Sequence, residues 1–186
     1  DADFEGFPYR LTRRTRINAL GSRGISFINT GRGRDLGTAV LALDLRGIDE
    51  AEVSWTGGTE LANSRVYAIR LQYRDGGVGD WSDLIDNNGN VVEYERASQN
   101  GHELEMGPTT LPETLMGRPY VQLRWKYYFT GEQLSAESGQ RDALRLDDIY
   151  VRQVRGVSTP SDDRQGYLPG RTELHPNVLF QFTATT

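Results

Sequence analysis

Strict alternation of apolar and polar residues over Tyr120–Thr130 constrains the fold of this chain more than any other feature of its sequence. Successive side chains of a β-strand point to opposite faces of its sheet, so the alternation predicts a strand with one buried and one solvent-facing side. The residues expected to face the core are Val121, Leu123, Trp125, Tyr127 and Phe129. The polar residues between them are expected on the outside.

The same two-residue period recurs along the chain, and no segment keeps a helical period over three turns. Gly57-Gly58 is expected to end one strand, and Asp86–Asn90 is expected to form a turn. Many short strands at regular spacing are typical of a sandwich or a barrel. Of these we predict an all-β, two-sheet antiparallel sandwich (jelly roll), with Leu71, Leu123, Trp125 and Leu146 in its core. The other strand candidates are Ile25–Thr30, Leu41–Leu45, Ala51–Thr56, Tyr67–Tyr73, Trp81–Ile85, Val91–Arg96, Glu103–Met106 and Ala143–Val154.

The length of 186 residues matches the roughly 100–200 residues expected of one domain. The strand pattern covers residues 1–154. Residues 155–186 begin with a segment rich in serine, proline, aspartate and glycine, which predicts a linker or tail. Within it, Asn177–Thr183 could form one more strand of the sandwich or begin a neighbouring module.

Composition excludes several function classes. The chain has no cysteine, which rules out disulfides and thiol chemistry. A net charge of −5 argues against nucleic acid as a partner. The longest apolar run, Ala39–Leu43, is far too short to cross a membrane, so we expect no membrane insertion. We expect a monomer.

Segments at both ends of the β-rich region, DFEGF at Asp3–Phe7 and LRLDDIYV at Leu144–Val151, resemble the paired terminal segments of MAM-type and cleaved-adhesin-type jelly rolls. Four internal segments resemble an accessory domain of large secreted bacterial proteins. The resemblance implies a secreted or cell-surface module of a larger parent chain, which binds an extracellular polysaccharide or serves in adhesion. The internal segments are NSRVYAIRLQYR (Asn63–Arg74), VEYER (Val92–Arg96), GPTTLP (Gly107–Pro112) and RPYVQLRWKYYF (Arg118–Phe129).

The resemblance also implies a structural calcium ion between the first and last strands. Asp3 and Glu5 lie at one end of the region, and Asp147 and Asp148 lie at the other. If those strands pair, the carboxylates converge, and a hard cation with six to eight oxygen ligands relieves their repulsion. The alternative is that these acids are solvated strand ends or arginine partners.

Two strands carry polar residues on their outward faces: Arg70, Gln72 and Arg74 on one, and Gln122, Arg124, Lys126 and Tyr128 on the other. If the strands are neighbours, these side chains form a platform of hydrogen-bond donors with an aromatic edge, which suits a sugar. Guanidinium groups match carboxylate or sulfate, so an acidic polysaccharide is favoured. Trp81 and Tyr9 lie outside the apolar faces and are further candidates for stacking on a sugar ring. The alternative is an ordinary exposed face covered by arginine stems.

Two other functions stay open. The first is a calcium-stabilised adhesion or spacer domain without a small ligand. The second is a jelly-roll polysaccharide hydrolase or lyase. Glu103 and Glu105 are spaced to share one strand face, as paired catalytic carboxylates would be. A lyase would instead use Gln122, Arg124, Lys126, Tyr127 and Tyr128 with His102. No nucleophile elbow, phosphate loop or histidine-rich metal motif appears, so a non-catalytic module is the leading prediction.

Overall fold

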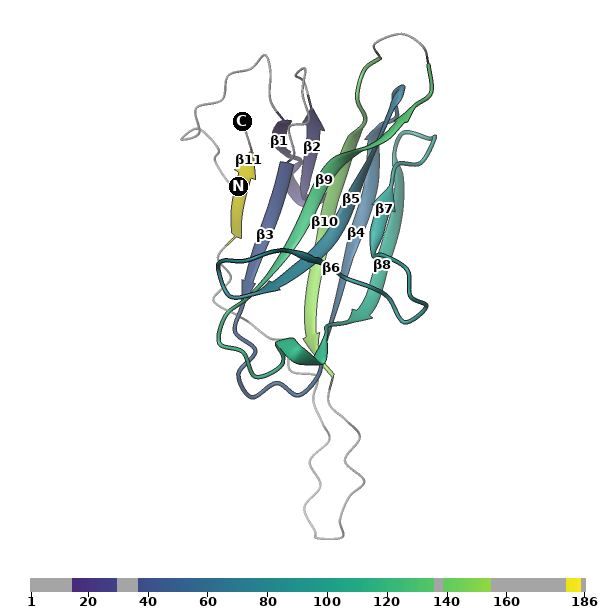
Figure 1. The fold of residues 1–186 in the computed structure, drawn as a ribbon. Coiled ribbons are helices and arrows are strands. Elements are labelled where there is room, and N and C mark those ends of the chain that lie inside the picture. The colour runs from purple at the N-terminus through teal and green to yellow at the C-terminus, as the bar shows by residue number, and fades with distance from the viewer. Residues whose placement is uncertain (1–14, 30–36, 136–138, 155–179, 185–186) are drawn as a thin grey trace.

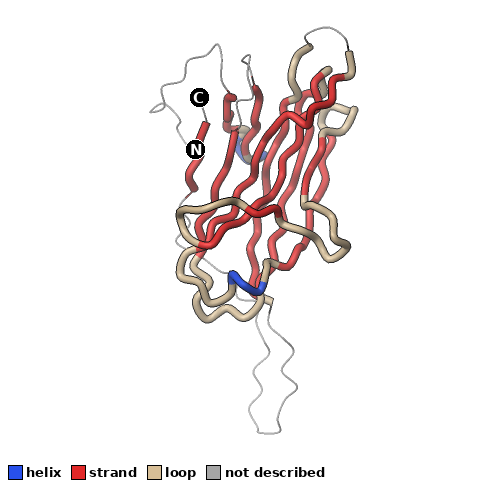
Figure 2. Tube along the Cα trace, viewed as in Figure 1, coloured by secondary structure: helices blue, strands red, loops and turns tan. Residues whose placement is uncertain are grey.

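The computed structural model describes residues 15–29, 37–135, 139–154 and 180–184, and these form two antiparallel β-sheets packed face to face (Figure 1). Strands run through almost the whole described chain, and the two short helices lie between strands (Figure 2). The predicted all-β, two-sheet sandwich is therefore confirmed. Neither of these helices, η1 (Gly21–Arg23) and η2 (Glu113–Leu115), is long and apolar enough to cross a membrane.

Each sheet is assembled from strands that are far apart in the sequence. From β2 to β5, and again from β8 to β11, each successive strand lies in the opposite sheet, which gives a winding like that of a jelly roll. The first sheet has the order β1 (Thr15–Ala19), β2 (Ile25–Asn29), β10 (Ala143–Gln153), β4 (Ala51–Leu61), β8 (His102–Thr110). The second has the order β11 (Phe180–Ala184), β3 (Gly37–Leu43), β9 (Val121–Gln133), β5 (Arg65–Asp75), β6 (Ser82–Asp83), and β7 (Glu93–Glu95) also pairs with β5.

The core between the sheets holds the residues that the alternating pattern places inside. Leu71, Leu123 and Trp125 are fully buried, and Leu146 is nearly so. The rings of Trp55 and Trp125 meet edge to face across the core, with their centroids 6.5 Å apart. Aromatic pairs of this kind add about 0.5–1.5 kcal/mol to the hydrophobic free energy of burial. The core prediction is therefore confirmed.

Strand β4 does not end at Gly57-Gly58, so the prediction of a break there is wrong. The strand continues to Leu61, and both glycines lie within it. A Cβ on Gly57 would stand 2.5 Å from the ring of Tyr94, and one on Gly58 would stand 3.1 Å from Nε of Arg145. These glycines admit two large side chains close to the strand, one on each face, which is the other reason for glycine inside a strand.

The chain outside the central strands also differs from expectation. Strand β1 carries no clear alternation and was not predicted. Strand β11 pairs with β3, so the segment at Asn177–Thr183 supplies a further strand to the second sheet, displaced to Phe180–Ala184. The short strand expected at Trp81–Ile85 covers only Ser82–Asp83.

A buried acid ties three strands together at the end of the sandwich where β10 begins. Asp142 has no exposed surface, and its carboxylate accepts the backbone N–H groups of Asn63 and Tyr67 at 2.5 and 2.9 Å. Arg96 lies 3.5 Å away, and the Tyr127 hydroxyl donates to the Asp142 carbonyl oxygen at 2.7 Å. Burial raises the pKa of the Asp142 carboxyl above its ordinary value. The backbone donors and the Arg96 charge lower this pKa, but burial has the larger effect.

We predict that Trp125→Ala lowers the free energy of unfolding by about 3–5 kcal/mol, because it leaves a large cavity in a core that cannot collapse onto it. Trp81→Ala is the matched control, because Trp81 lies outside the core and its ring packs against the guanidinium groups of Arg74 and Arg124. Its loss should cost about 1–2 kcal/mol. Urea denaturation of both variants measures the difference, and equal losses would contradict the assignment of Trp125 to the core.

Candidate ligand-binding face

The outer face of the second sheet brings the predicted platform residues together. Strands β5 and β9 are direct neighbours, and their register sets Arg70 opposite Lys126, Gln72 opposite Arg124, and Arg74 opposite Gln122. Opposite residues on one face of an antiparallel pair have Cβ atoms about 4.5–5.5 Å apart. We call this surface the cationic face and define it as Arg70, Gln72, Arg74, Gln122, Arg124, Lys126 and Tyr128, with Trp81 lying over it.

One corner of the cationic face is already neutralised. The guanidinium of Arg70 donates from Nε to Glu93 at 2.6 Å and from Nη1 to Asp83 at 3.0 Å, and from Nη2 to the hydroxyl of Tyr128 at 2.7 Å. The Tyr128 hydroxyl in turn donates to Glu93. Burial and the neighbouring Glu93 carboxylate raise the pKa of Tyr128 well above its ordinary value, so this hydroxyl stays protonated. The Arg70 corner is a structural ion-pair network.

Trp81 holds a segment of chain across the lower part of the face. The segment around β6 crosses in front of β5 and β9 (Figure 1). Its Trp81 ring stacks against two guanidinium groups, with the ring centroid 4.3 Å from Cζ of Arg74 and 4.1 Å from Cζ of Arg124. Arg74 also donates to Gln122 at 2.6 Å and to the Gly79 carbonyl at 3.3 Å. The indole is therefore used within the protein, and its role in stacking on a sugar stays a prediction.

Three cations of this face, Arg74, Arg124 and Lys126, have no ion-pair partner among the described residues, and Arg124 and Lys126 lie side by side on β9. Within the described part of the chain, no carboxylate oxygen lies within 4.0 Å of a charged nitrogen of Arg124 or Lys126, and Asp83 acts on both only from a greater distance. Arg124 donates to the uncharged Gln72 amide oxygen from Nε at 3.0 Å and also from Nη2. Burial, together with the charge of Arg74, lowers the pKa of Arg124 to about 10. Burial and the charges of Arg124 and Arg70 also lower the pKa of Lys126.

The direction of these shifts means that the folded chain disfavours the positive charge. Arg124, with its pKa lowered to about 10, still carries its proton at neutral pH, so the folded state bears that cost under physiological conditions. The Arg124 charge lowers the free energy of unfolding. This loss is recovered only as the pH rises above about 10, where the folded chain releases the Arg124 proton before the unfolded chain does. An anion placed against Arg124 and Lys126 would recover it at neutral pH.

The predicted calcium ligands are only partly described. Asp3 and Glu5, like Tyr9, lie outside the described residues. Both carboxylate oxygens of Asp147 already accept hydrogen bonds. Oδ2 accepts one from Arg145 at 3.0 Å, and Oδ1 accepts one from the Asp148 backbone N–H at 2.9 Å. Asp148 sits at a bulge of β10 with a positive φ of 45°. In the described segments, no group of three metal-ligating side chains comes together, and calcium stays a prediction.

Arg145 organises the acids on the outer face of the first sheet. Its side chain is 4% exposed and lies 2.5 Å from Glu103, 3.0 Å from Asp147 and 3.6 Å from Glu60. Glu60 also pairs with Arg23 at 3.2 Å. The acids of this surface therefore surround a buried arginine, and Glu103 is one of them.

The residues of the lyase alternative are only partly brought together, because Gln122, Arg124, Lys126 and Tyr128 share the cationic face but Tyr127 and His102 do not. Tyr127 faces the core with no exposed surface, whereas Lys126 and Tyr128 point outward. His102 lies in β8 of the other sheet, where its Nδ1 is 3.0 Å from the hydroxyl of the buried Tyr94. Glu103 of the proposed acid pair is ion-paired with Arg145.

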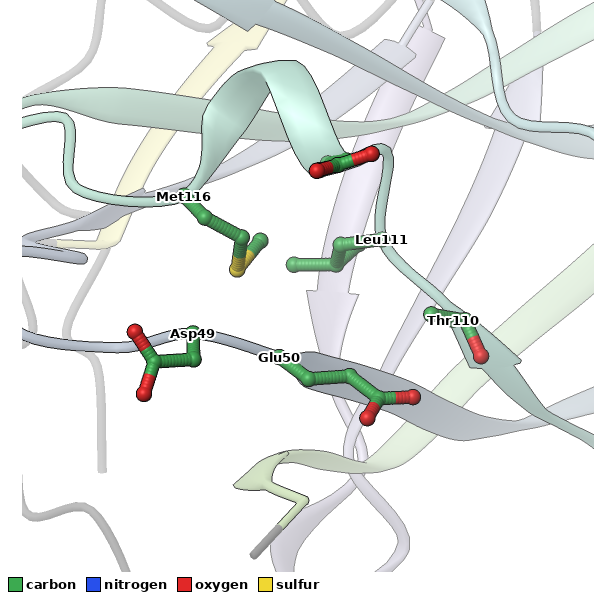
Figure 3. A pocket seen from close by; sticks show the side chains of 6 residues that line it. Asp49, Glu50, Thr110, Leu111 and Met116 are labelled. Carbon is green, nitrogen blue, oxygen red and sulfur yellow. The ribbon is translucent and has the colours of Figure 1, made fainter. Parts of the chain in front are cut away.

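A pocket of about 280 Å³ lies at the end of the sandwich that carries η2 (Figure 3). The side chains of Leu111 and Met116 approach its centre, and the carboxylates of Asp49 and Glu50 point away from one another. The remaining lining residues are Thr110 and Glu113. Its three acids make it unsuited to an anionic ligand. Sequence analysis did not single it out because its residues come from two segments, 49–50 and 110–116, that are far apart in the chain.

Sequence analysis missed the residues that decide the charge of the cationic face. Asp83 lies in the strand candidate Trp81–Ile85 and Glu93 in the strand candidate Val91–Arg96, and neither carries a predicted role. Their positions beside β5 follow from the pairing of β6 and β7 with the same strand, which alternation alone does not specify. An outward Glu93 in VEYER was the available signal, since it alternates with the buried Val92 and Tyr94.

Comparison with known proteins adds no assignment: no family model, curated protein or solved structure matches this chain.

We predict that Arg124→Gln leaves the stability of the ligand-free protein almost unchanged, because the lost hydrogen bonds to Gln72 are offset by removal of an uncompensated charge. Sodium sulfate, compared with sodium chloride at equal ionic strength, should raise the melting temperature of the wild type more than that of Arg124→Gln. Arg152→Gln is the matched control, since Arg152 pairs with Glu52 at 2.8 Å on the other sheet. An equal response of all three proteins would show that sulfate acts only through general exclusion.

Proposed function

We propose that this chain is a non-catalytic module of a secreted or cell-surface bacterial protein, and that its cationic face binds an acidic extracellular polysaccharide. The observation that carries the proposal is the pair Arg124 and Lys126, partly buried on one face with no carboxylate against them among the residues described. Perturbed, uncompensated charges gather at functional sites more often than elsewhere.

The ligand chemistry follows from what the face offers. Planar guanidinium and amide groups suit carboxylate, sulfate and hydroxyl groups, whereas the Trp81 ring is already covered by Arg74 and Arg124. Recognition would therefore rest on charge and hydrogen bonds more than on stacking against an indole. The face as defined carries four cations, and Asp83 and Glu93 neutralise part of that charge.

The net charge of −5 opposes an anionic ligand at long range. Exposed charges are screened beyond about 8 Å at physiological salt, so the local sign of the cationic face governs contact. The acids around Arg145 and those at the pocket belong to other surfaces. A polyanion would thus be drawn to one face and repelled from the others.

We predict that the protein binds polygalacturonate or dextran sulfate and not neutral dextran, in isothermal titration or affinity electrophoresis. Arg124→Gln and Lys126→Gln should each weaken binding by about tenfold, a loss of about 1.4 kcal/mol. Arg152→Gln should bind like the wild type, because Arg152 lies on the other sheet. A preference for the sulfated or the carboxylated polymer would identify the anionic group.

Several outcomes would contradict the proposal. Equal binding to neutral dextran would exclude a role for charge. Release of reducing ends or unsaturated sugars from the polymer would exclude a non-catalytic module. Absence of binding to every polysaccharide would favour the second candidate, an adhesion or spacer domain, which the internal ion pairing of Arg70 independently supports.

A structural calcium ion held by some of Asp3, Glu5, Asp147 and Asp148 remains part of the proposal. The two carboxylate oxygens of Asp147 are already partnered, so Asp148 is the described residue best able to contribute. We predict that calcium raises the melting temperature and that a chelator lowers it, with a gain of about 2.7 kcal/mol at a hundredfold excess over Kd. Asp148→Asn should reduce the calcium response, and Asp49→Asn, at the pocket, should leave it intact.

A further inference from the structure

Between β3 and the pair β6 and β7, the register of the second sheet sets the outward side chains in four parallel rows, and the cationic face forms the middle two. From β3 outward the rows are Thr38, Val40 and Ala42, then Lys126, Arg124 and Gln122 of β9, then Arg70, Gln72 and Arg74 of β5, and finally Glu93 and Asp83 of β7 and β6. Each row lies one strand spacing, about 4.8 Å, from the next. Charge therefore changes sign in one direction across the sheet.

The β6 and β7 side of the face is closed to an anion. Glu93 and Asp83 hold Arg70 between them, and Asp83 also accepts the amide of Gln72 at 2.6 Å. An anionic group over β5 would meet these carboxylates and would have to break an existing ion pair. The segment carrying Trp81 lies over Arg74 and Arg124 as well.

The outward side chains on β3 are smaller than those on β5 and β9, and they carry no charge. Val40 is directly opposite Arg124, and Ala42 is directly opposite Gln122. Both residues are short and partly exposed, next to a row of long side chains on β9. The outward side chains described on β3 carry no charge, so nothing on this strand competes for the two uncompensated cations of β9.

We propose that the polyanion lies along β3, over the partly exposed Val40 and Ala42, with its anionic groups turned toward Arg124 and Lys126. This inference rests on the proposed function and specifies where the ligand runs. Residues two apart on a strand are about 6.6–6.8 Å apart, so Arg124 and Lys126 are spaced to contact two charged groups of one extended chain. The face then selects an extended polymer with repeated charges over a single small anion.

Val40→Glu tests the position, because it sets a carboxylate opposite Arg124 on an outward side chain. It should weaken binding of polygalacturonate or dextran sulfate by about tenfold or more, whereas the uncharged Val40→Gln should change affinity by less than about twofold. Glu95→Gln removes a negative charge from β7 at the opposite edge and should also change affinity by less than about twofold. Thermal melting establishes that each variant is folded.

Ala42→Glu serves in place of Val40→Glu if the latter does not fold, with a smaller expected loss because it is opposite Gln122. Unchanged binding by the folded Val40→Glu, together with tighter binding by Glu95→Gln, would overturn the inference and move the ligand over β5 and β7. The proposed function would survive that result. Failure of the wild type to bind either polymer would instead overturn the proposed function itself.

Discussion

The pleat of β9 is the constraint on which the rest of the structure depends. The strand is central in its sheet, and its inward residues, Leu123, Trp125 and Tyr127, have no exposed surface. Because side chains alternate strictly, burying that row forces Gln122, Arg124 and Lys126 onto the opposite face. A slip of one residue would exchange the two rows and place charges in the core, so the register is fixed by hydrophobic burial. The position of the cationic face is therefore a consequence of the core.

Sequence analysis could locate the core and half of the candidate site for the same reason. The alternation of apolar and polar residues identifies which residues of β5 and β9 share a face. The observed pairing of the two strands then brings their outward rows together. Sequence analysis could not identify the carboxylates that neutralise Arg70, since Asp83 and Glu93 reach β5 through long-range pairing. The interpretation of Gly57 failed because a local turn signal and a close packing contact look alike in sequence. Only the position of the Tyr94 ring separates them.

Arginine plays two opposite roles on the two outer faces. On the first sheet, Arg145 is buried beneath three carboxylates, and the removal of any one leaves two to satisfy it. On the second sheet, Arg124 contacts the neutral Gln72 and Trp81 side chains beside the charge of Arg74, and the Asp83 carboxylate acts on it only from beyond ion-pair distance. A guanidinium group therefore forms ion pairs within the protein on one surface and has no carboxylate partner among the described residues on the other. This contrast distinguishes a structural arginine from a candidate ligand contact better than exposure does.

The uncompensated pair also explains why the acidic side of the face matters. If Asp83 and Glu93 lay near β3 instead of beside β5, they would neutralise Arg124 and Lys126 and leave Arg70 exposed. The observed order keeps the carboxylates three strand spacings away from β3, beyond direct hydrogen-bond reach of its outward residues. The sheet thus separates charge laterally: its β7 edge is stabilised internally, while its β3 side keeps an attractive field for an external anion. A fold built only for mechanical spacing gains nothing from that separation, because pairing all four cations would make the face more stable.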